Sequence, residues 1–116
     1  MEHIFHLQNE PYRLISDGEK SVELRLLDEK RQRIAVGDRI CFLCEEGNAP
    51  LFARVTKLVT ADNFTALFEI VPPPLCGISD CRRAIAMMDT YYTKEAQRRY
   101  RALAIYFVPE KTEGTL

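Results

Sequence analysis

The chain has 116 residues, of which 47% are hydrophobic, and its formal net charge at pH 7 is -1. These totals suit one globular domain with its own core and exclude a global basic field, so any contact with nucleic acid must come from a local patch. Because no run of about 18 apolar residues occurs and the N-terminus lacks the features of a signal peptide, we expect a cytoplasmic protein without a membrane span.

Hydrophobic alternation and turn-forming residues predict the elements of the first half of the chain. A short strand is expected over residues 3–8, followed by a helix that Asn9 caps and Gly18 ends. The densely charged segment 27–33 is typical of a solvated loop or helical turn. A tight turn is expected at Gly37-Asp38. The other strands are predicted over residues 20–26, 39–43 and 51–59.

The second half of the chain reads as helices followed by a closing strand. Asp62-Asn63 can cap a helix over residues 64–70, which the three prolines at 72–74 end. In the preceding strand, strict alternation places Leu58 on the same face as Phe52 and opposite Val55. The remaining elements are expected as a helix capped by Ser79 that runs through Met88, a helix from Thr93 to about Tyr100, and a strand over residues 101–108.

This order of elements predicts an α+β domain over residues 1–108 and a tail over residues 109–116. The three middle strands follow one another without crossover helices, which favours antiparallel pairing over a doubly wound parallel sheet. We therefore predict a small, mostly antiparallel β-barrel of about five strands with flanking helices.

The four cysteines are Cys41, Cys44, Cys76 and Cys81. Without a signal peptide, reduced thiols are expected in place of disulfides. Cys41 and Cys44 lie in a predicted strand, where positions three apart face opposite sides, whereas zinc-binding pairs usually converge on turns. We predict that the cysteines are small buried residues and that the chain holds no metal and no cofactor.

The strand predicted over residues 20–26 has two distinct faces. Its apolar side chains suit a core, and its polar side chains form a row with Lys20 at the strand entrance. Taken alone, the polar row predicts a solvated face with an ion pair. The apolar set is Val22, Leu24 and Leu26, and the polar set is Ser21, Glu23 and Arg25.

The context of this strand points to a known family. The run Gly18-x-Lys20-Ser21-Val22-Glu23-Leu24-Arg25 follows Pro11-Tyr12 in a short helix and precedes Gly37-Asp38. This pattern resembles the ASCH domain of the PUA-like superfamily, over about residues 3–107. Segments 28–32 and 91–95 are similar to its bacterial single-domain branch.

The resemblance implies a PUA-like β-barrel with a cleft beside the motif strand. It also implies binding of RNA, or in some members DNA or modified nucleosides. One branch of the family removes the acetyl group from acetylcytidine, with the motif lysine acting beside a threonine and a distant glutamate. Here Lys20 matches that lysine, but Glu23 stands where the threonine is expected, so only Lys20 and Arg25 carry over. Arg101 follows Tyr100 where family members often have Tyr-Gly.

The residues favour one hypothesis above the others, binding of RNA or a nucleotide. Basic side chains would contact phosphates, tyrosines would stack on bases, and Glu23 would accept a hydrogen bond from a base amino group. The helix that carries Arg98 and Arg99 is equally consistent with a solvated structural helix. The candidate ligand-binding residues are Lys20, Ser21, Glu23, Arg25, Lys30, Arg31, Tyr91, Tyr92, Arg98 and Arg99.

Two alternatives remain open at this point. One is an amidohydrolase acting on acylated nucleosides, with Lys20 and Glu23 as catalytic residues and Glu23 activating a water molecule. Ser21 is a possible nucleophile there, and His3 or His6 would assist only if the first strand lines the cleft. The other alternative is a protein-interaction module. The oligomeric state is left open.

Overall fold

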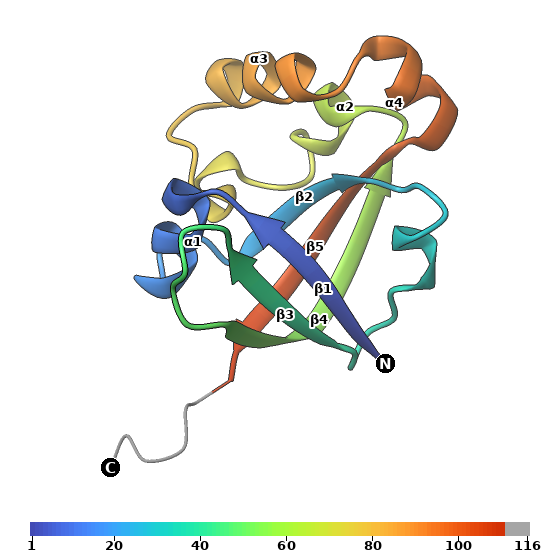
Figure 1. Ribbon diagram of the computed structural model, residues 1–116. Coiled ribbons are helices and arrows are strands. Elements are labelled where there is room, and N and C mark those ends of the chain that lie inside the picture. The colour runs from blue at the N-terminus through green and yellow to red at the C-terminus, as the bar shows by residue number, and fades with distance from the viewer. Residues whose placement is uncertain (111–116) are drawn as a thin grey trace.

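The computed structural model describes residues 1–110 and contains one curled five-stranded sheet with helices beside it (Figure 1). The strands are β1 (Glu2–Leu7), β2 (Val22–Leu26), β3 (Arg39–Cys44), β4 (Leu51–Ala61) and β5 (Ala102–Pro109). The α-helices are α1 (Asn9–Ser16), α2 (Phe64–Leu67), α3 (Cys81–Tyr91) and α4 (Lys94–Tyr100), and the 3-10 helices are η1 (Arg31–Arg33) and η2 (Pro73–Cys76).

The strand order in the sheet is β1-β3-β4-β5-β2. The pairs β3–β4, β4–β5 and β5–β2 are antiparallel, and β1 pairs with β3 in parallel. The sheet is therefore a mixed half-barrel whose two edges are β1 and β2. The predicted α+β fold, with its mostly antiparallel five-stranded sheet and flanking helices, is confirmed.

The concave face of the sheet holds an aromatic and aliphatic core. Phe42 lies at its centre, with ring centroids 6.0 Å from Phe5 and 5.1 Å from Phe107. Leu103, Ile105 and Phe107 occupy every second position of β5 and pack into this core, as the alternation of a strand predicts.

A second core lies on the other face of the sheet, under the helices. Val22 and Leu24 of β2 pack there with Phe64 of α2 and with Ala84 and Met88 of α3. In Figure 1, α2, α3 and α4 form a layer over this face. β5 contributes side chains to both cores, whereas β2 contributes Val22 and Leu24 to the second core alone.

A bulge in β4 overturns the predicted alternation of that strand. The β4–β5 register shifts between Val55 and Lys57. Leu58 therefore packs into the same core as Val55, where strict alternation had placed it on the opposite face. A bulge adds one residue to one strand of a pair and so reverses the facing of the residues beyond it.

Two predicted helix caps are shifted by one position, and two are confirmed. Gln8 occupies the N-cap position of α1, so Asn9 is already helical. Asp80, rather than Ser79, caps α3 by accepting a hydrogen bond from the backbone N–H of Arg83 at 2.9 Å. Asn63 caps α2 and Thr93 caps α4, as predicted.

The cysteines and the last described residues differ in part from expectation. Cys41, Cys44 and Cys76 are buried as predicted, but Cys81 is exposed because it is the first residue of α3. Glu110, beyond β5, pairs with Arg39 at 2.9 Å. The rest of the predicted tail, residues 111–116, lies outside the described residues. Within residues 1–110, no helix is long and apolar enough to cross a membrane.

Candidate functional site

The strongest candidate site is built on an ion-paired trio in the motif strand. Glu23 on β2 is buried, with its side chain 5% exposed, and it lies between Lys20 and Arg25. Lys20 Nζ is 2.8 Å from Glu23 Oε1, and Arg25 Nη2 is 3.0 Å from Glu23 Oε2. The trio thus places two cations against one carboxylate at low exposure.

The carboxylate of Glu23 is fully engaged by its neighbours. Oε1 also accepts the backbone N–H of Leu24 at 3.3 Å, and Oε2 also accepts Arg25 Nε–H at 3.3 Å. An ionised carboxylate has about four lone-pair sites, and all of them are used here. The predicted hydrogen bond from a base amino group to Glu23 therefore has no free acceptor. Glu23 instead fixes the positions of Lys20 and Arg25.

The charges around Glu23 also determine its protonation. Burial alone would raise the pKa of Glu23, but the charges of Lys20 and Arg25 and their hydrogen bonds outweigh this effect and lower the pKa. Glu23 is therefore ionised at neutral pH. An ionised carboxylate held by two cations is a weak proton acceptor, which argues against Glu23 as a general base.

Arg25 connects the two edge strands of the half-barrel. Its Nη2 donates a hydrogen bond to the backbone carbonyl of His6 on β1 at 3.4 Å. Its guanidinium carbon lies 4.7 Å from the ring centroid of Phe5, also on β1. These contacts span the opening between β2 and β1 and hold the guanidinium in one orientation.

A cleft of about 510 Å³ lies over this trio. Its walls come from the end of β1, from α1, from β2, from the segment around η2, and from α3, and Lys20, Glu23 and Arg25 all line it. This volume is within the usual range of small-molecule sites, about 300–1,000 Å³. Several segments that are distant in the sequence therefore meet at one cleft beside the motif strand.

Helix α3 supplies the tyrosine side of the cleft. Tyr92, just after α3, stacks on Phe64 with ring centroids 5.6 Å apart, and burial is the main reason that its pKa is raised. Tyr91 also lines the cleft but is 62% exposed. Arg83 and Met87 lie on the same wall. Neither residue was predicted from the sequence, although the steps of four residues from Arg83 to Met87 and from Met87 to Tyr91 were the available signal.

The segment after η2 closes the cleft beside Lys20. Gly77 has a positive φ of 80°, and a Cβ there would lie 2.9 Å from Leu14 Cδ1 and 3.6 Å from Lys20 Cβ. Glycine therefore permits the close approach of this segment to α1 and Lys20. Burial raises the pKa of the neighbouring Cys76 thiol to about 12, so this cleft residue stays protonated.

Several of the predicted site residues lie elsewhere. Ser21 does not line the cleft, and its backbone bonds to Leu75 and Phe107. Arg31 does not line the cleft either; its guanidinium carbon is 5.6 Å from the Phe5 ring centroid, and it forms an ion pair with Asp28 at 2.9 Å.

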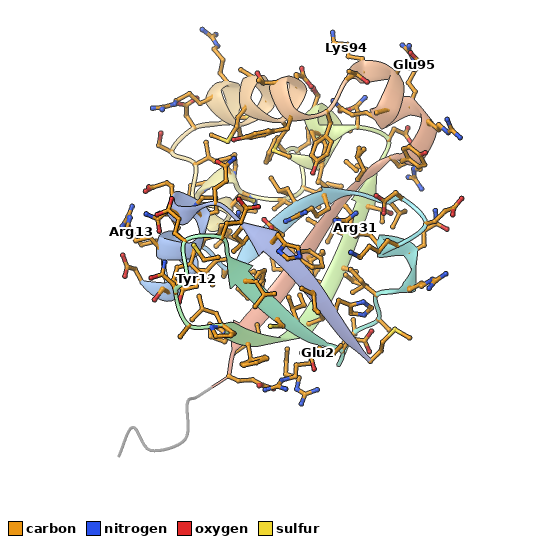
Figure 2. The ribbon with its side chains drawn as sticks, in the orientation of Figure 1. Glu2, Tyr12, Arg13, Arg31, Lys94 and Glu95 are labelled. Carbon is orange, nitrogen blue, oxygen red and sulfur yellow. The ribbon has the colours of Figure 1, made fainter. Side chains whose placement is uncertain are left out.

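The remaining predicted basic residues are also outside the cleft. Lys30 is exposed beside η1. Arg98 lines a separate cavity of about 350 Å³ between α2, α3 and α4, and Arg99 lies over its neighbour Tyr100 at 5.2 Å. Figure 2 shows Lys94 at the α4 end of the helical layer, away from α1 and its Arg13. The structure thus separates the α4 basic residues from the cleft.

The two histidines lie in different places, and only one of them lines the cleft. His6 lines the cleft, whereas the buried His3 is hydrogen-bonded to Asp38 at 2.8 Å. Among residues 1–110, no group of three His, Cys, Asp or Glu side chains is placed to hold a metal ion.

A half-barrel with a cleft beside a Gly-x-Lys-x-x-Glu-x-Arg strand defines the class of protein. The chain belongs to the ASCH domain family, whose family model matches residues 5–111. The resemblance found in the sequence is therefore confirmed, and the expected PUA-like barrel takes the form of a five-stranded half-barrel.

Solved structures share the fold of this chain. The chain is 29% identical to hypothetical protein PH0355, with a TM-score of 0.83 over 95% of this chain and 100% of that one. It is 30% identical to protein PF0455 from Pyrococcus furiosus, with a TM-score of 0.68 over 97% and 100%. The ASCH protein from Zymomonas mobilis, at 20% identity and a TM-score of 0.64 over 93% and 69%, shares the fold. No curated protein matches the chain.

Proposed function

We propose that the chain binds RNA by holding one nucleotide, ordinary or modified, in the cleft over the Lys20–Glu23–Arg25 trio. The observation that carries this proposal is the full engagement of Glu23, which leaves the trio with a net positive charge and with N–H donors only. Lys20 has further N–H groups, and Nη1 of Arg25 is not used by Glu23. Such a surface suits phosphate oxygens and base carbonyls.

The rest of the cleft supports a nucleotide over a simple anion. Tyr92 offers aromatic surface on the α3 side of the cleft, and unstacked bases bind to such rings. Glu10 also lines the cleft, but its carboxylate is paired with Arg13 at 2.7 Å. The charge available to a ligand is therefore positive, although the chain as a whole is close to neutral.

The geometry favours binding over hydrolysis of an acylated nucleoside. Glu23 is ionised and has no free lone pair, Cys76 stays protonated, and Ser21 is outside the cleft. Among the described cleft residues, the imidazole and carboxylate groups left to activate water are His6 and Glu10, and Glu10 is paired with Arg13 at 2.7 Å. We therefore expect no release of acetate from acetylcytidine.

The test is fluorescence anisotropy with labelled single-stranded and hairpin RNA across a salt series. Lys20→Ala and Arg25→Ala should each weaken binding about tenfold, because each removes a charge-assisted hydrogen bond. Each should also make the salt dependence shallower, since fewer counterions are released. Lys57→Ala is the matched control, because Lys57 is an exposed cation on β4 outside the cleft.

Circular dichroism of each variant separates loss of binding from loss of folding. If the folded Lys20→Ala and Arg25→Ala variants bind RNA as Lys57→Ala does, the cleft is not the binding site. If the wild type binds no RNA at low salt, the proposed function is wrong, and hydrolysis of acylated nucleosides becomes the next assay.

A further inference from the structure

Helix α3 presents a stripe of three side chains along the mouth of the cleft. Arg83, Met87 and Tyr91 are spaced by four residues, so they lie on one face of the helix, and all three line the cleft. At a rise of about 1.5 Å per residue, the stripe is about 12 Å long. We call these three residues the α3 rim.

The side chains of the α3 rim do not pack into the hydrophobic core. The buried face of α3 is the neighbouring one, where Ala84 and Met88 pack into the core. By contrast, Met87 is 39% and Tyr91 is 62% exposed. None of the ion pairs among residues 1–110 involves Arg83, whose guanidinium is therefore free to meet an anion.

The side chains of the α3 rim are complementary to the successive parts of a nucleotide. A cation, an apolar side chain and an exposed aromatic ring stand in a row, and they match a phosphate, a sugar and a base. Tyr91 and Tyr92 are adjacent in the chain but differ in burial: Tyr92 packs on Phe64, whereas Tyr91 projects at the mouth. Tyr92 therefore offers aromatic surface inside the cleft, and Tyr91 offers it at the mouth.

We propose that the α3 rim binds the nucleotide next to the one held in the cleft, so that the ligand is a single-stranded stretch of RNA and not a free nucleotide. This inference rests on the proposed function, because it needs a first nucleotide over the Lys20–Glu23–Arg25 trio. Arg83 contacts the linking phosphate, and Tyr91 stacks on the neighbouring base.

The test is a competition series against a labelled uridine hexanucleotide, with uridine monophosphate, the dinucleotide and the hexanucleotide as competitors. For the wild type, the dinucleotide should compete about tenfold better than the monophosphate, since it adds a stacked base and a phosphate contact. Arg83→Ala and Tyr91→Ala should each weaken hexanucleotide binding about fivefold to tenfold and leave binding of the monophosphate unchanged.

Two matched variants control for helix stability and for the tyrosine hydroxyl. Arg82→Ala changes an exposed arginine next to Arg83 that does not line the cleft, and it should bind the hexanucleotide as the wild type does. Tyr91→Phe keeps the ring and should also retain full affinity. Loss of affinity in Tyr91→Phe would contradict stacking as the role of Tyr91.

The outcomes distinguish this inference from the proposed function. If Arg83→Ala and Tyr91→Ala bind the hexanucleotide as Arg82→Ala does while Lys20→Ala has lost affinity, the rim has no role and the cleft proposal stands. If the rim variants weaken the monophosphate and the hexanucleotide equally, the rim belongs to the first nucleotide and the inference is overturned. If the wild type binds none of these ligands, both proposals fail.

Discussion

Arg101 occupies a backbone conformation that should make Arg101→Gly more stable than the wild type. It lies between α4 and β5 with φ 71° and ψ 169°, and it is the one non-glycine residue among residues 1–110 with a positive φ. This region is populated essentially by glycine because a Cβ is crowded there. The surrounding structure holds the conformation: the Arg101 N–H donates to Gln97 at 2.7 Å, and its carbonyl accepts from Leu27 at 2.9 Å.

The expected gain follows from three contributions. Relief of the strained backbone is worth about 1–3 kcal/mol. Glycine lowers this gain by about 0.4–1 kcal/mol, because it gives the unfolded chain more freedom. The ion pair from Arg101 to Asp62 is 3.4 Å long and its side chains are 48% and 87% exposed, so its loss should matter little. The net increase in the free energy of unfolding is then about 1 kcal/mol.

Urea unfolding followed by far-UV circular dichroism measures this difference, since the chain has no tryptophan for fluorescence. Arg101→Ala is the matched control: it removes the guanidinium but keeps a Cβ at the same φ. We expect Arg101→Ala to stay within about 0.5 kcal/mol of the wild type, as surface changes usually do. Equal stability of Arg101→Gly and Arg101→Ala, or a lower stability of the glycine variant, would refute the strain argument.

Three further changes test other parts of the structure. Glu23→Gln should lower the free energy of unfolding by about 2 kcal/mol in urea, because it leaves two partly buried cations without their counter-charge; an unchanged urea midpoint would show that the trio is not a buried unit. The hydrogen bond with His3 is the main reason that the pKa of Asp38 is lowered to about 2. The stability from Asp38 is therefore present above its unfolded pKa of about 3.9 and lost as the pH falls toward 2. Asp38→Asn should flatten this acid decline, and a pH profile identical to that of the wild type would contradict the assignment. A thiol reagent should react rapidly with Cys81, the exposed cysteine, and this fast phase should disappear in Cys81→Ser; a fast phase that survives the substitution would mean that a buried thiol opens readily.

Much of the fold was predictable because local patterns agree with the tertiary packing. The alternation in β5 follows directly from the two cores on either side of the sheet. What the pattern could not give was the pairing of strands. The parallel pairing of β1 with β3 and the bulge near Thr56 in β4 depend on contacts between distant segments. Strict alternation therefore failed at Leu58, where the bulge changes the facing of the chain.

The trio shows how far the sequence could predict the site. Glu23 and Arg25 are two apart in one strand, so alternation alone places them on the same face. Strict alternation would also place Ser21 on this face of the strand and Lys20 on the opposite face. However, β2 begins at Val22, so Lys20 lies before the regular strand and its side chain reaches Glu23 at 2.8 Å. Ser21 is held by backbone hydrogen bonds outside the cleft.

The walls of the cleft could not be predicted, because they depend on which strands form the sheet edges. β1 and β2 are at opposite ends of the strand order, and curling of the sheet brings them near enough for Arg25 to reach the carbonyl of His6. Helix α3 lies between β4 and β5 in the chain, and it places Arg83 in the wall of the same cleft as the trio although about 60 residues separate them in the sequence. Arg25 belongs to the family motif, but nothing in the local sequence of Arg83 or His6 links either residue to that motif. Their common location is a property of the topology, so single substitutions at Arg83 and Arg25 should affect the same ligand although neither residue's local sequence indicates the other.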